Sequence, residues 1–315
     1  MNRKYDVMCV GLAVVNFPIG PVDETLFRRD LTQVDKIELL SGGDAVNQAI
    51  ILSRMKLKTT LMTAIGADGF GEILLKSLNA DGKGIDLSKI SIYKEDSTGV
   101  CAMLIAPDGQ RNFCIHRGAL LKFGIDDIDC SLLSETKVVS IGGFMSLPAF
   151  DGDGSRRFLK RAKEQGAITV VDTKKDLWGI GFEGIRETLP YIDYFFPSID
   201  EAKEITGKEA VEEIADIFLQ AGVKNVGIKL GSEGSYFKNA AGEFYTDPYP
   251  CDVIDTTGSG DNFMAGFITG ILQGWNLQKC CKFAGAIGAI NATMVGPTKA
   301  VQSFEQVIEF QKEKE

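Results

Sequence analysis

Residues Asp255 to Phe263 read Asp-Thr-Thr-Gly-Ser-Gly-Asp-Asn-Phe, a combination that is suited to binding phosphate. Apolar residues recur at helical spacing after the glycines, so the pattern predicts a loop that opens a helix. Backbone N–H groups of Gly258, Ser259, Gly260 and Asp261 would lie unpaired at the helix start, where the helix dipole adds positive potential. Such a helix start binds anions, and glycine lets a phosphate approach the backbone closely. The segment matches neither the P-loop nor the dinucleotide-binding pattern.

Asp261 is unexpected in this setting, because a carboxylate at the mouth of a phosphate site repels the phosphate. One interpretation is a general base that takes the proton from an attacking hydroxyl, which is a role that phosphoryl transfer needs. The other interpretation is an acidic residue that stabilises the start of the helix. The residue type alone leaves both open.

A second glycine pair, Gly42 and Gly43, precedes another expected helix at 43–56. Asn47 lies about one turn into that helix, where its amide could contact a substrate. An asparagine on the exposed face of the helix is the alternative.

The composition limits the classes of function. The chain has 315 residues, of which 44% are hydrophobic, and its net charge is -9. An acidic protein repels nucleic acid and anionic membrane surfaces, so we expect neither as a partner. His116 is the single histidine, which argues against zinc sites with several histidines and against a Ser-His-Asp hydrolase. No signal peptide or membrane-spanning run is apparent, and the cysteines are scattered, so we expect a cytoplasmic protein with reduced thiols.

Short apolar runs alternate with helical patterns along the chain. Each run is almost continuously apolar, as in a parallel sheet that is covered on both faces. This alternation predicts an α/β fold, in which a single domain (residues 1–315) contains a doubly wound, mostly parallel sheet flanked by helices. We expect strands at 5–11, 58–65, 137–142, 168–172, 193–197 and 225–230, and helices at 43–56, 69–80, 154–165, 199–206, 210–221, 260–273, 277–293 and 304–314.

Two regions, approximately 12–42 and 97–118, interrupt this alternation. They would form a small separate β-sheet, with strands at 14–19, 34–40, 98–105 and 111–117. The segment Pro107-Asp-Gly109 predicts the turn between the last two strands. We interpret the small sheet as a lid over the main domain, and a β-meander on the surface is the alternative.

The two glycine motifs together resemble the ribokinase-like (PfkB) family of carbohydrate and nucleoside kinases. The first motif is similar to the family pattern at Gly42, Gly43, Asn47 and Ala49, and the second at Asp255, Thr256, Gly258, Gly260, Asp261 and Phe263. The resemblance covers essentially the whole chain. It implies an ATP-dependent sugar kinase that transfers the γ-phosphoryl group of MgATP to a hydroxyl of a sugar or sugar derivative.

The resemblance also implies roles for particular residues. Asp261 would be the general base, and Gly258, Ser259 and Gly260 would form the anion hole for the transferred phosphoryl group. The implied substrate contacts are Asn16, Gly42, Gly43 and Asn47, and the implied ATP contacts are Lys229, Gly231, Ser232, Gly234, Thr256 and Asn291. Glu201 would organise water around Mg²⁺, and Asp255 and Thr257 match positions that hold a monovalent cation, such as K⁺, in several members.

Three positions differ from the pattern that is usual in the family. Ser198 stands where many members have asparagine, which puts the magnesium network in question. Asn16 stands where many carry an aspartate that holds sugar hydroxyls, and Asp23 is a candidate to compensate for it. Asp44 follows the glycine pair where ribokinases usually carry lysine. These differences affect the identity of the substrate more than the type of reaction.

Arg111, His116 and Arg117 lie on or just after the predicted lid hairpin. If two of them face inward, they would suit an acidic or phosphorylated sugar, with Arg117 as a substrate contact. Exposed charges on the lid are the alternative.

We therefore expect a small-molecule sugar or sugar-like substrate and a homodimer formed through the lid. A nucleoside kinase of the same fold is the rival, with Phe17 or Phe113 as the aromatic residue that would stack on a base. A non-catalytic nucleotide-binding regulator is a further alternative, and the presence of Asp261 argues against it.

Overall fold

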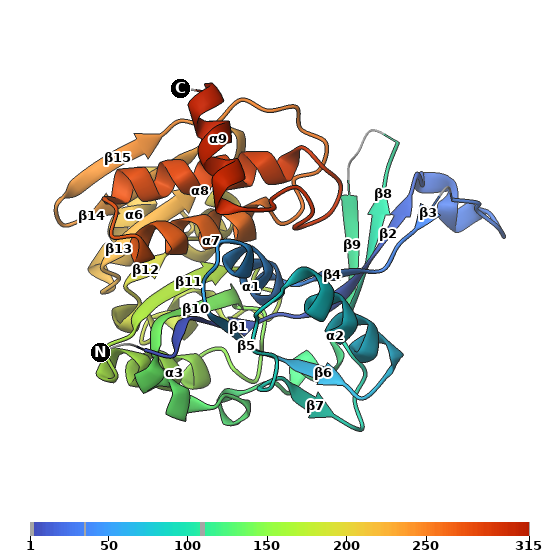
Figure 1. Ribbon diagram of the computed structural model, residues 1–315, viewed down its shortest axis with the longest axis horizontal. Coiled ribbons are helices and arrows are strands. Elements are labelled where there is room, and N and C mark those ends of the chain that lie inside the picture. Colours follow the sequence, from blue (N-terminus) through green and yellow to red (C-terminus); the bar gives the residue numbers. More distant parts are fainter. Residues whose placement is uncertain (1–2, 35, 108–110, 315) are drawn as a thin grey trace.

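The computed structural model describes residues 3–34, 36–107 and 111–314. An eight-stranded sheet forms its centre, in the order β15-β14-β13-β12-β11-β10-β1-β5 (Figure 1). Six strands are parallel: β1 (Tyr5–Gly11), β5 (Thr59–Met62), β10 (Thr136–Phe144), β11 (Ile168–Thr173), β12 (Tyr194–Phe195) and β13 (Asn225–Lys229). The strands β14 (Ser235–Asn239) and β15 (Gly242–Thr246) add an antiparallel edge.

Helices cover both faces of this sheet. One face carries α1 (Asp44–Arg54), α2 (Gly69–Asp81), α7 (Ser259–Leu272), α8 (Leu277–Ala292) and α9 (Phe304–Lys314). The other carries α3 (Asp153–Glu164), α4 (Gly181–Ile185), α5 (Ile199–Thr206) and α6 (Val211–Gln220). Short 3-10 helices occur at Glu24–Arg28, Gly118–Leu121, Ile125–Asp127, Cys130–Glu135, Leu189–Tyr191 and Gly231–Glu233. Two apolar clusters result, and β1 contributes Val7 and Cys9 to one and Met8 and Val10 to the other.

A second, small sheet projects to one side of the main body (Figure 1). It contains β2 (Val14–Gly20), β3 (Lys36–Ile37), β4 (Leu40–Gly42), β8 (Val100–Ile105) and β9 (Arg111–His116). The strands β8 and β9 pair antiparallel, as predicted. Part of the predicted turn between them, at 108–110, lies outside the described residues.

The register of the small sheet determines which side chains share a face. Asn16 pairs with Cys101, and Cys101 pairs with Ile115. Since side chains alternate along each strand, Phe113 and Arg111 lie on this same face. Phe17 points to the opposite face, where its ring packs edge-on against Phe70 of α2, with 5.5 Å between centroids.

Several predicted boundaries were wrong in detail. The run at 58–65 is two strands, β5 and β6 (Ala64–Gly66), because the chain leaves the central sheet at Thr63 and β6 pairs with β7 (Ser91–Tyr93). The strand expected at 34–40 is likewise divided between β3 and β4. A continuous apolar run does not reveal such a change of partner.

Among the described residues, the elements that were not predicted are α4, β7, β14, β15 and the 3-10 helices. The hairpin of β14 and β15 had a local signal, since Asn239 precedes Gly242 and its Oδ1 accepts a hydrogen bond from the N–H of Ala241 at 2.8 Å.

The strand order reverses between β1 and β10, which is where an open α/β sheet binds ligands at its carboxyl edge. Glycine makes room for α1 at this place. A Cβ at Gly142 would lie 2.6 Å from the backbone nitrogen of Ala45. The start of α1 therefore packs directly over the carboxyl end of β10, and this places its first-turn side chains at the reversal point.

Candidate active site

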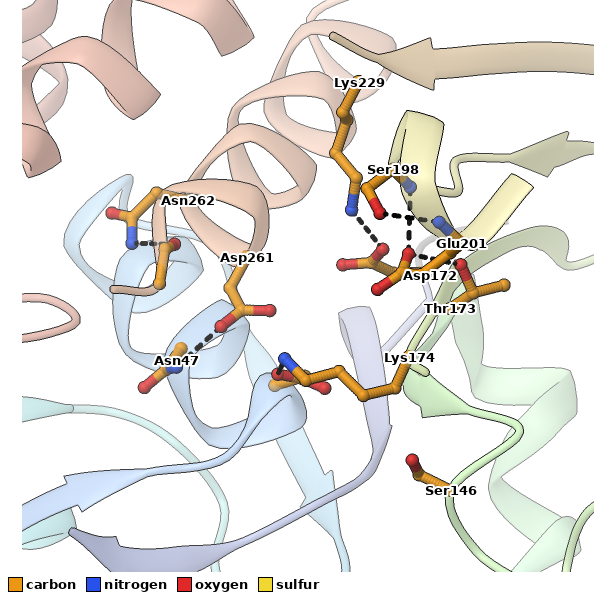
Figure 2. Close-up of polar contacts among 12 residues, drawn as sticks. Asn47, Ser146, Asp172, Thr173, Lys174, Ser198, Glu201, Lys229, Asp261 and Asn262 are labelled. Atoms are coloured by element: carbon orange, nitrogen blue, oxygen red, sulfur yellow. Dashed lines mark hydrogen bonds and ion pairs between the residues drawn. The ribbon is translucent and has the colours of Figure 1, made fainter. Parts of the chain in front are cut away.

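Asp261 lies in the first turn of α7 and is buried, with 6% of its surface exposed. The helix begins after Gly258, whose φ of 78° is a left-handed conformation that favours glycine. Asn47 Nδ2 donates a hydrogen bond to Asp261 Oδ2 at 2.7 Å (Figure 2). This contact joins the two glycine motifs. It also shows that Asn47 is buried and does not lie on an exposed face of the helix, which was the alternative interpretation.

The pKa of Asp261 is raised well above the ordinary value of an aspartate. Burial is the main cause, and the negative charge of Asp44 adds to it. The positive charge of Lys174 and the hydrogen bond from Asn47 act in the opposite direction. A carboxylate of raised pKa is a stronger proton acceptor, as a general base requires.

Asp44 and Lys174 form an ion pair beside Asp261, with 3.0 Å between Asp44 Oδ1 and Lys174 Nζ. Asp44 begins α1, and Lys174 follows the last residue of β11. The pKa of Lys174 is raised, mainly by the charge of Asp44, and its side chain is half exposed. A lysine from the end of β11 thus lies beside Asp44, the residue that follows the glycine pair.

This pair predicts opposite shifts in the pH dependence of activity. Asp44→Asn removes a negative charge and should lower the pKa of Asp261, so the acidic limb of kcat/KM should move to lower pH. Lys174→Met removes a positive charge, so the limb should move to higher pH. Lys175→Met, at the exposed neighbouring position, is the matched control and should leave the limb in place. Shifts of both site variants in the same direction would contradict the prediction.

Lys229 and Asp172 form a second, more buried ion pair at the carboxyl ends of β13 and β11 (Figure 2). Burial raises the pKa of Asp172 to about 6, although Lys229 opposes this shift. Burial lowers the pKa of Lys229, but the negative charges of Asp172, Glu201 and Asp261 outweigh burial, so the pKa is raised overall. A Cβ at Gly260 would lie 3.3 Å from Lys229 Nζ. Lys229 is the last residue of β13, and its ammonium group thus lies at the glycine-rich helix start.

The carboxylate of Glu201 is held by the end of β11 and by the residue that caps α5. Its Oε2 accepts hydrogen bonds from Thr173 Oγ1 at 2.8 Å and from the N–H of Ser198 at 2.9 Å. The hydroxyl of Ser198 accepts in return from the N–H of Glu201, which completes a capping box. Asparagine is an equally good helix cap, so the serine at this position preserves the local geometry.

The acidic groups near Glu201 determine what metal the site suits. In the described part of the chain, no group of three or more His, Cys, Asp and Glu side chains is arranged to hold a metal ion. Glu201 and Asp172 are nevertheless close enough for the charge of Glu201 to raise the pKa of Asp172. One or two carboxylates suit Mg²⁺, which keeps several waters and binds mainly through phosphate oxygens. The residues present therefore fit magnesium that arrives with a nucleotide.

Buried asparagines support the glycine-rich loop. Asn291 Nδ2 donates to the carbonyl of Thr257 at 2.8 Å, and Asn262 Nδ2 donates to the carbonyl of Gly258 at 2.8 Å. The amide of Ser259 is bonded to the carbonyl of Thr256 at 3.1 Å. The side chain of Asn291 is fully buried and has no exposed surface to offer a ligand. In this structure it therefore supports the loop, whereas the sequence predicted a contact with ATP.

The three basic candidates of the predicted lid differ in their surroundings. Arg111 pairs with Asp255, with 2.7 Å between Nη1 and Oδ1, and its Nη1 donates to Thr257 Oγ1 at 3.0 Å. Arg117 is 8% exposed, and its Nη2 donates to Ser146 Oγ at 3.4 Å. His116 is exposed, with Nε2 2.7 Å from Ser97 Oγ. Two of the three candidates, Arg111 and Arg117, therefore face inward.

Three buried polar atoms, on Asp44 and on residues that interact with Asp44 or Asp261, have no hydrogen-bond partner among the described residues: Asp44 Oδ2, Asn47 Oδ1 and Arg117 Nη1. They belong to one cluster, because Asp44 interacts electrostatically with both Asp261 and Arg117. Buried polar groups are normally paired, so this cluster has the character of a binding site for a polar ligand.

The remaining predicted contacts lie at two places. Asn16 is buried on β2, and a Cβ at Gly42 would lie 2.1 Å from its Nδ2, so glycine is required for this approach. Gly43 caps α1 with φ 97°. The predicted ATP residues in the turn after β13 are accessible, because Gly231 and Ser232 are exposed and Gly234 is half-buried. Thr256, which precedes α7, is exposed as well.

Asp172, Lys174 and Ser146 are site residues that were not predicted from the sequence. All three follow or end apolar parallel strands, and polar residues at the carboxyl ends of such strands are a signal for a ligand site. The run Asp172-Thr-Lys174 after an apolar strand carried this signal.

Comparison with known proteins places the chain among kinases. A family model described as pfkB family carbohydrate kinase matches residues 4–303. A 5-dehydro-2-deoxygluconokinase from Clostridium perfringens is 27% identical over 328 residues, which span 100% of this chain and 95% of that relative. A 2-dehydro-3-deoxygluconokinase from Bacillus subtilis is 28% identical over 285 residues, spanning 86% of each. The structure of a ribokinase from Thermotoga maritima has a TM-score of 0.85 at 24% identity, with 98% of this chain and 99% of that chain covered.

The doubly wound sheet, the small second sheet and the acidic residue at a glycine-rich helix start define a ribokinase-like small-molecule kinase. The chain belongs to the pfkB family of carbohydrate kinases. The predicted fold class and carbohydrate-kinase function are thereby confirmed. A structural neighbour from E. coli was solved with ATP and Mg²⁺. No helix among the described residues is long and apolar enough to cross a membrane.

Proposed function

We propose that the protein transfers the γ-phosphoryl group of MgATP to a hydroxyl of a sugar acid, with Asp261 as the general base. The observation that carries this proposal is the cluster of unpaired buried atoms of Asp44, Asn47 and Arg117, in which Asp44 interacts with both Asp261 and Arg117. Oxygen and nitrogen atoms of this kind would be satisfied by the hydroxyls and the carboxylate of such a substrate.

The proton transfer would take place at the start of α7. The Asp261 carboxylate accepts the proton of the substrate hydroxyl, whose oxygen forms a bond to the γ-phosphorus while the bond to the β-phosphate bridging oxygen breaks. Asn47 holds the carboxylate in position through its 2.7 Å hydrogen bond. ADP leaves with the electron pair of the broken bond.

The negative charge that develops on the transferred group would be stabilised by two kinds of group. The amides of Gly260 and Asp261 belong to the first turn of α7, whose N–H groups a helix cannot pair internally. The ammonium of Lys229 lies next to Gly260. Fixed donors and charges of this kind act without reorganisation during the reaction.

Magnesium and ATP would be held on the other side of Asp261. Glu201 and Asp172 are the carboxylates that would order the waters of the metal, which supplies charge neutralisation on the phosphates when bound. The accessible turn around Gly231, Ser232 and Gly234, together with Thr256, stays our prediction for the contacts with the nucleotide.

Arg117 is the residue that favours an acidic substrate. Its guanidinium is nearly buried, one of its terminal nitrogens has no partner among the described residues, and Lys174 adds a second cation at the same site. Two of the relatives reported above are named as kinases of dehydro-deoxygluconate compounds, which carry a carboxylate. A guanidinium recognises a carboxylate through parallel hydrogen bonds.

A substrate panel of sugar acids, the corresponding neutral sugars and nucleosides tests this proposal. Arg117→Gln should raise KM for the best sugar acid about 10–100-fold, because a charged hydrogen bond contributes roughly 1.5–3 kcal/mol. KM for ATP should stay unchanged. Arg157→Gln, at an exposed position on α3, is the control variant. Two results would refute the proposal of an acidic substrate. One is that the wild type prefers neutral sugars; the other is that Arg117→Gln loses the same factor in kcat/KM on a sugar acid and on its neutral analogue.

A nucleoside substrate is the second candidate, and one observation favours it. Phe113 is 57% exposed and lies on the same face of the small sheet as Asn16, where its ring could stack on a base. Phe17, the other aromatic candidate, points to the opposite face and packs on Phe70. Phosphorylation of nucleosides but not of sugars in the same panel would support this alternative, whereas a non-catalytic regulator would phosphorylate neither.

The small sheet, within 12–42 and 97–118 of the single domain, would act as the lid that closes over the substrate and excludes water. A homodimer through this lid stays a prediction. It is supported by apolar side chains of the region that are largely exposed, including Phe27 (88%), Leu31 (85%) and Ile37 (58%). The cytoplasmic location also stays a prediction from the sequence.

A further inference from the structure

A nearly buried ion pair connects the small sheet to the loop that precedes α7. Arg111 Nη1 lies 2.7 Å from Asp255 Oδ1, and the two side chains are 16% and 5% exposed. Arg111 begins β9, whereas Asp255 belongs to the glycine-rich segment of the proposed anion hole. Separation of such a shielded pair leaves an uncompensated charge in a poorly hydrated place, so the contact opposes movement of the two segments apart.

Asp255 is the centre of a network that determines the shape of this loop. Its Oδ1 also accepts a hydrogen bond from the N–H of Thr257 at 2.8 Å, and its Oδ2 accepts from the N–H of Gly296 at 2.9 Å. Its own N–H donates to the carbonyl of Ala292 at 3.0 Å. The carboxylate thus ties together the loop before α7 and the segment after α8, and its position affects the amides that follow at Gly258 and Gly260.

Asp255 and Thr257 are the two residues for which the resemblance implied a bound monovalent cation. In this chain both Asp255 oxygens already accept hydrogen bonds, and Thr257 Oγ1 accepts one from Arg111 at 3.0 Å. The positive charge beside Asp255 comes from the guanidinium itself. While Arg111 is in place, the charge of Asp255 is therefore already compensated, and these two side chains offer a free cation no unpaired negative charge.

We infer that the guanidinium of Arg111 takes the place of the monovalent cation in this protein, and that it couples closure of the small sheet to the geometry of the anion hole. This inference rests on the proposed kinase function. Arg111 is a positioning residue, because it acts on the reacting groups through Asp255. It lies on the face of the small sheet that also carries Asn16, so the strand that would cover the substrate also fixes the phosphate-binding loop.

The inference first predicts that the wild-type enzyme needs no monovalent cation. Its kcat should be the same without K⁺ and with K⁺ at about 100 mM, when tetramethylammonium keeps the ionic strength constant. A clear rise in the activity of the wild type with K⁺, absent with tetramethylammonium, would overturn the inference.

The variant Arg111→Ala should lower kcat about 10²-fold, because the loop loses its fixed position. Its activity should now rise with K⁺ or with guanidinium ion, since Asp255 is left without its cation. Arg111→Lys should retain more activity than Arg111→Ala and should respond less to added cations. The double variant Arg111→Ala/Asp255→Asn removes the uncompensated carboxylate as well, so it should fold and show no response. Arg157→Ala serves as the control for loss of an arginine.

A second measurement does not depend on kinase activity. K⁺ should raise the thermal unfolding midpoint of Arg111→Ala, because a bound cation stabilises the folded state, but not that of the wild type or the double variant. Absence of this response would refute the inference even if the enzyme is an active sugar kinase. A wild type that phosphorylates no member of the panel would instead refute the proposed function, while the unfolding midpoint still tests the role of Arg111.

Discussion

Asp261→Asn should lower kcat by ~10²–10⁴-fold, since it removes the group that accepts the proton of the substrate hydroxyl. The fold should be preserved, because the asparagine carbonyl can still accept the hydrogen bond that Asn47 donates at 2.7 Å. Binding of ATP should change little. The measurements are the rate of phosphoryl transfer on the best substrate and the Kd for ATP from calorimetry.

A matched control separates this role from the alternative that Asp261 only stabilises the helix start. Asp200 is an acidic residue in the first turn of α5, it is exposed, and it lies outside the proposed catalytic groups. Asp200→Asn should reduce only the favourable interaction with the helix dipole, roughly 0.3–1 kcal/mol of stability. If Asp261→Asn behaves in the same way and keeps a nearly normal kcat, Asp261 is not the base.

Lys229→Met should lower kcat by ~10²–10³-fold, as expected when a fixed donor to a developing negative charge is removed. The reason is the position of the ammonium, next to Gly260 at the start of α7. Methionine retains much of the length of the lysine side chain and removes its charge. Rapid-quench measurement of the chemical step would show whether the loss occurs there or in the binding of ATP.

Loss of Lys229 also leaves the buried Asp172 without its partner, which would destabilise the fold by itself. The double variant Lys229→Met/Asp172→Asn removes both charges and should recover stability but not activity. Lys224→Met is the control, because this lysine pairs with Asp193 and its side chain is 60% exposed. Recovery of a nearly normal kcat in the double variant would exclude the proposed electrostatic role.

Much of the fold could be predicted because its signals are local. Six parallel strands and eight of the helices followed from apolar runs and helical spacing, and their boundaries agree with the structure within a few residues except where the run at 58–65 divides. The hairpin of β14 and β15 was missed because each strand mixes two aromatic residues with polar ones, so both lack the continuous apolar pattern of the parallel strands.

The sequence by itself determined the residue types that can do the chemistry. A glycine with positive φ at position 258, the helix that follows it and the acidic residue in its first turn are properties of one short segment. The same holds for Gly43 and α1. Backbone sterics and helical periodicity act over a few residues, and they can therefore be recognised without knowledge of the rest of the chain.

Only the tertiary structure decided the partners of these residues. Asn47 contacts Asp261, Lys174 pairs with Asp44, and Arg111 reaches Asp255, although each pair is far apart in the chain. Such contacts depend on the order of the strands, on the register of the small sheet and on how α1 and α7 meet at the carboxyl edge. The physical reason is that charge and hydrogen bonding act over a few ångströms in space. A residue type therefore acquires its role from the partners that the fold brings to it.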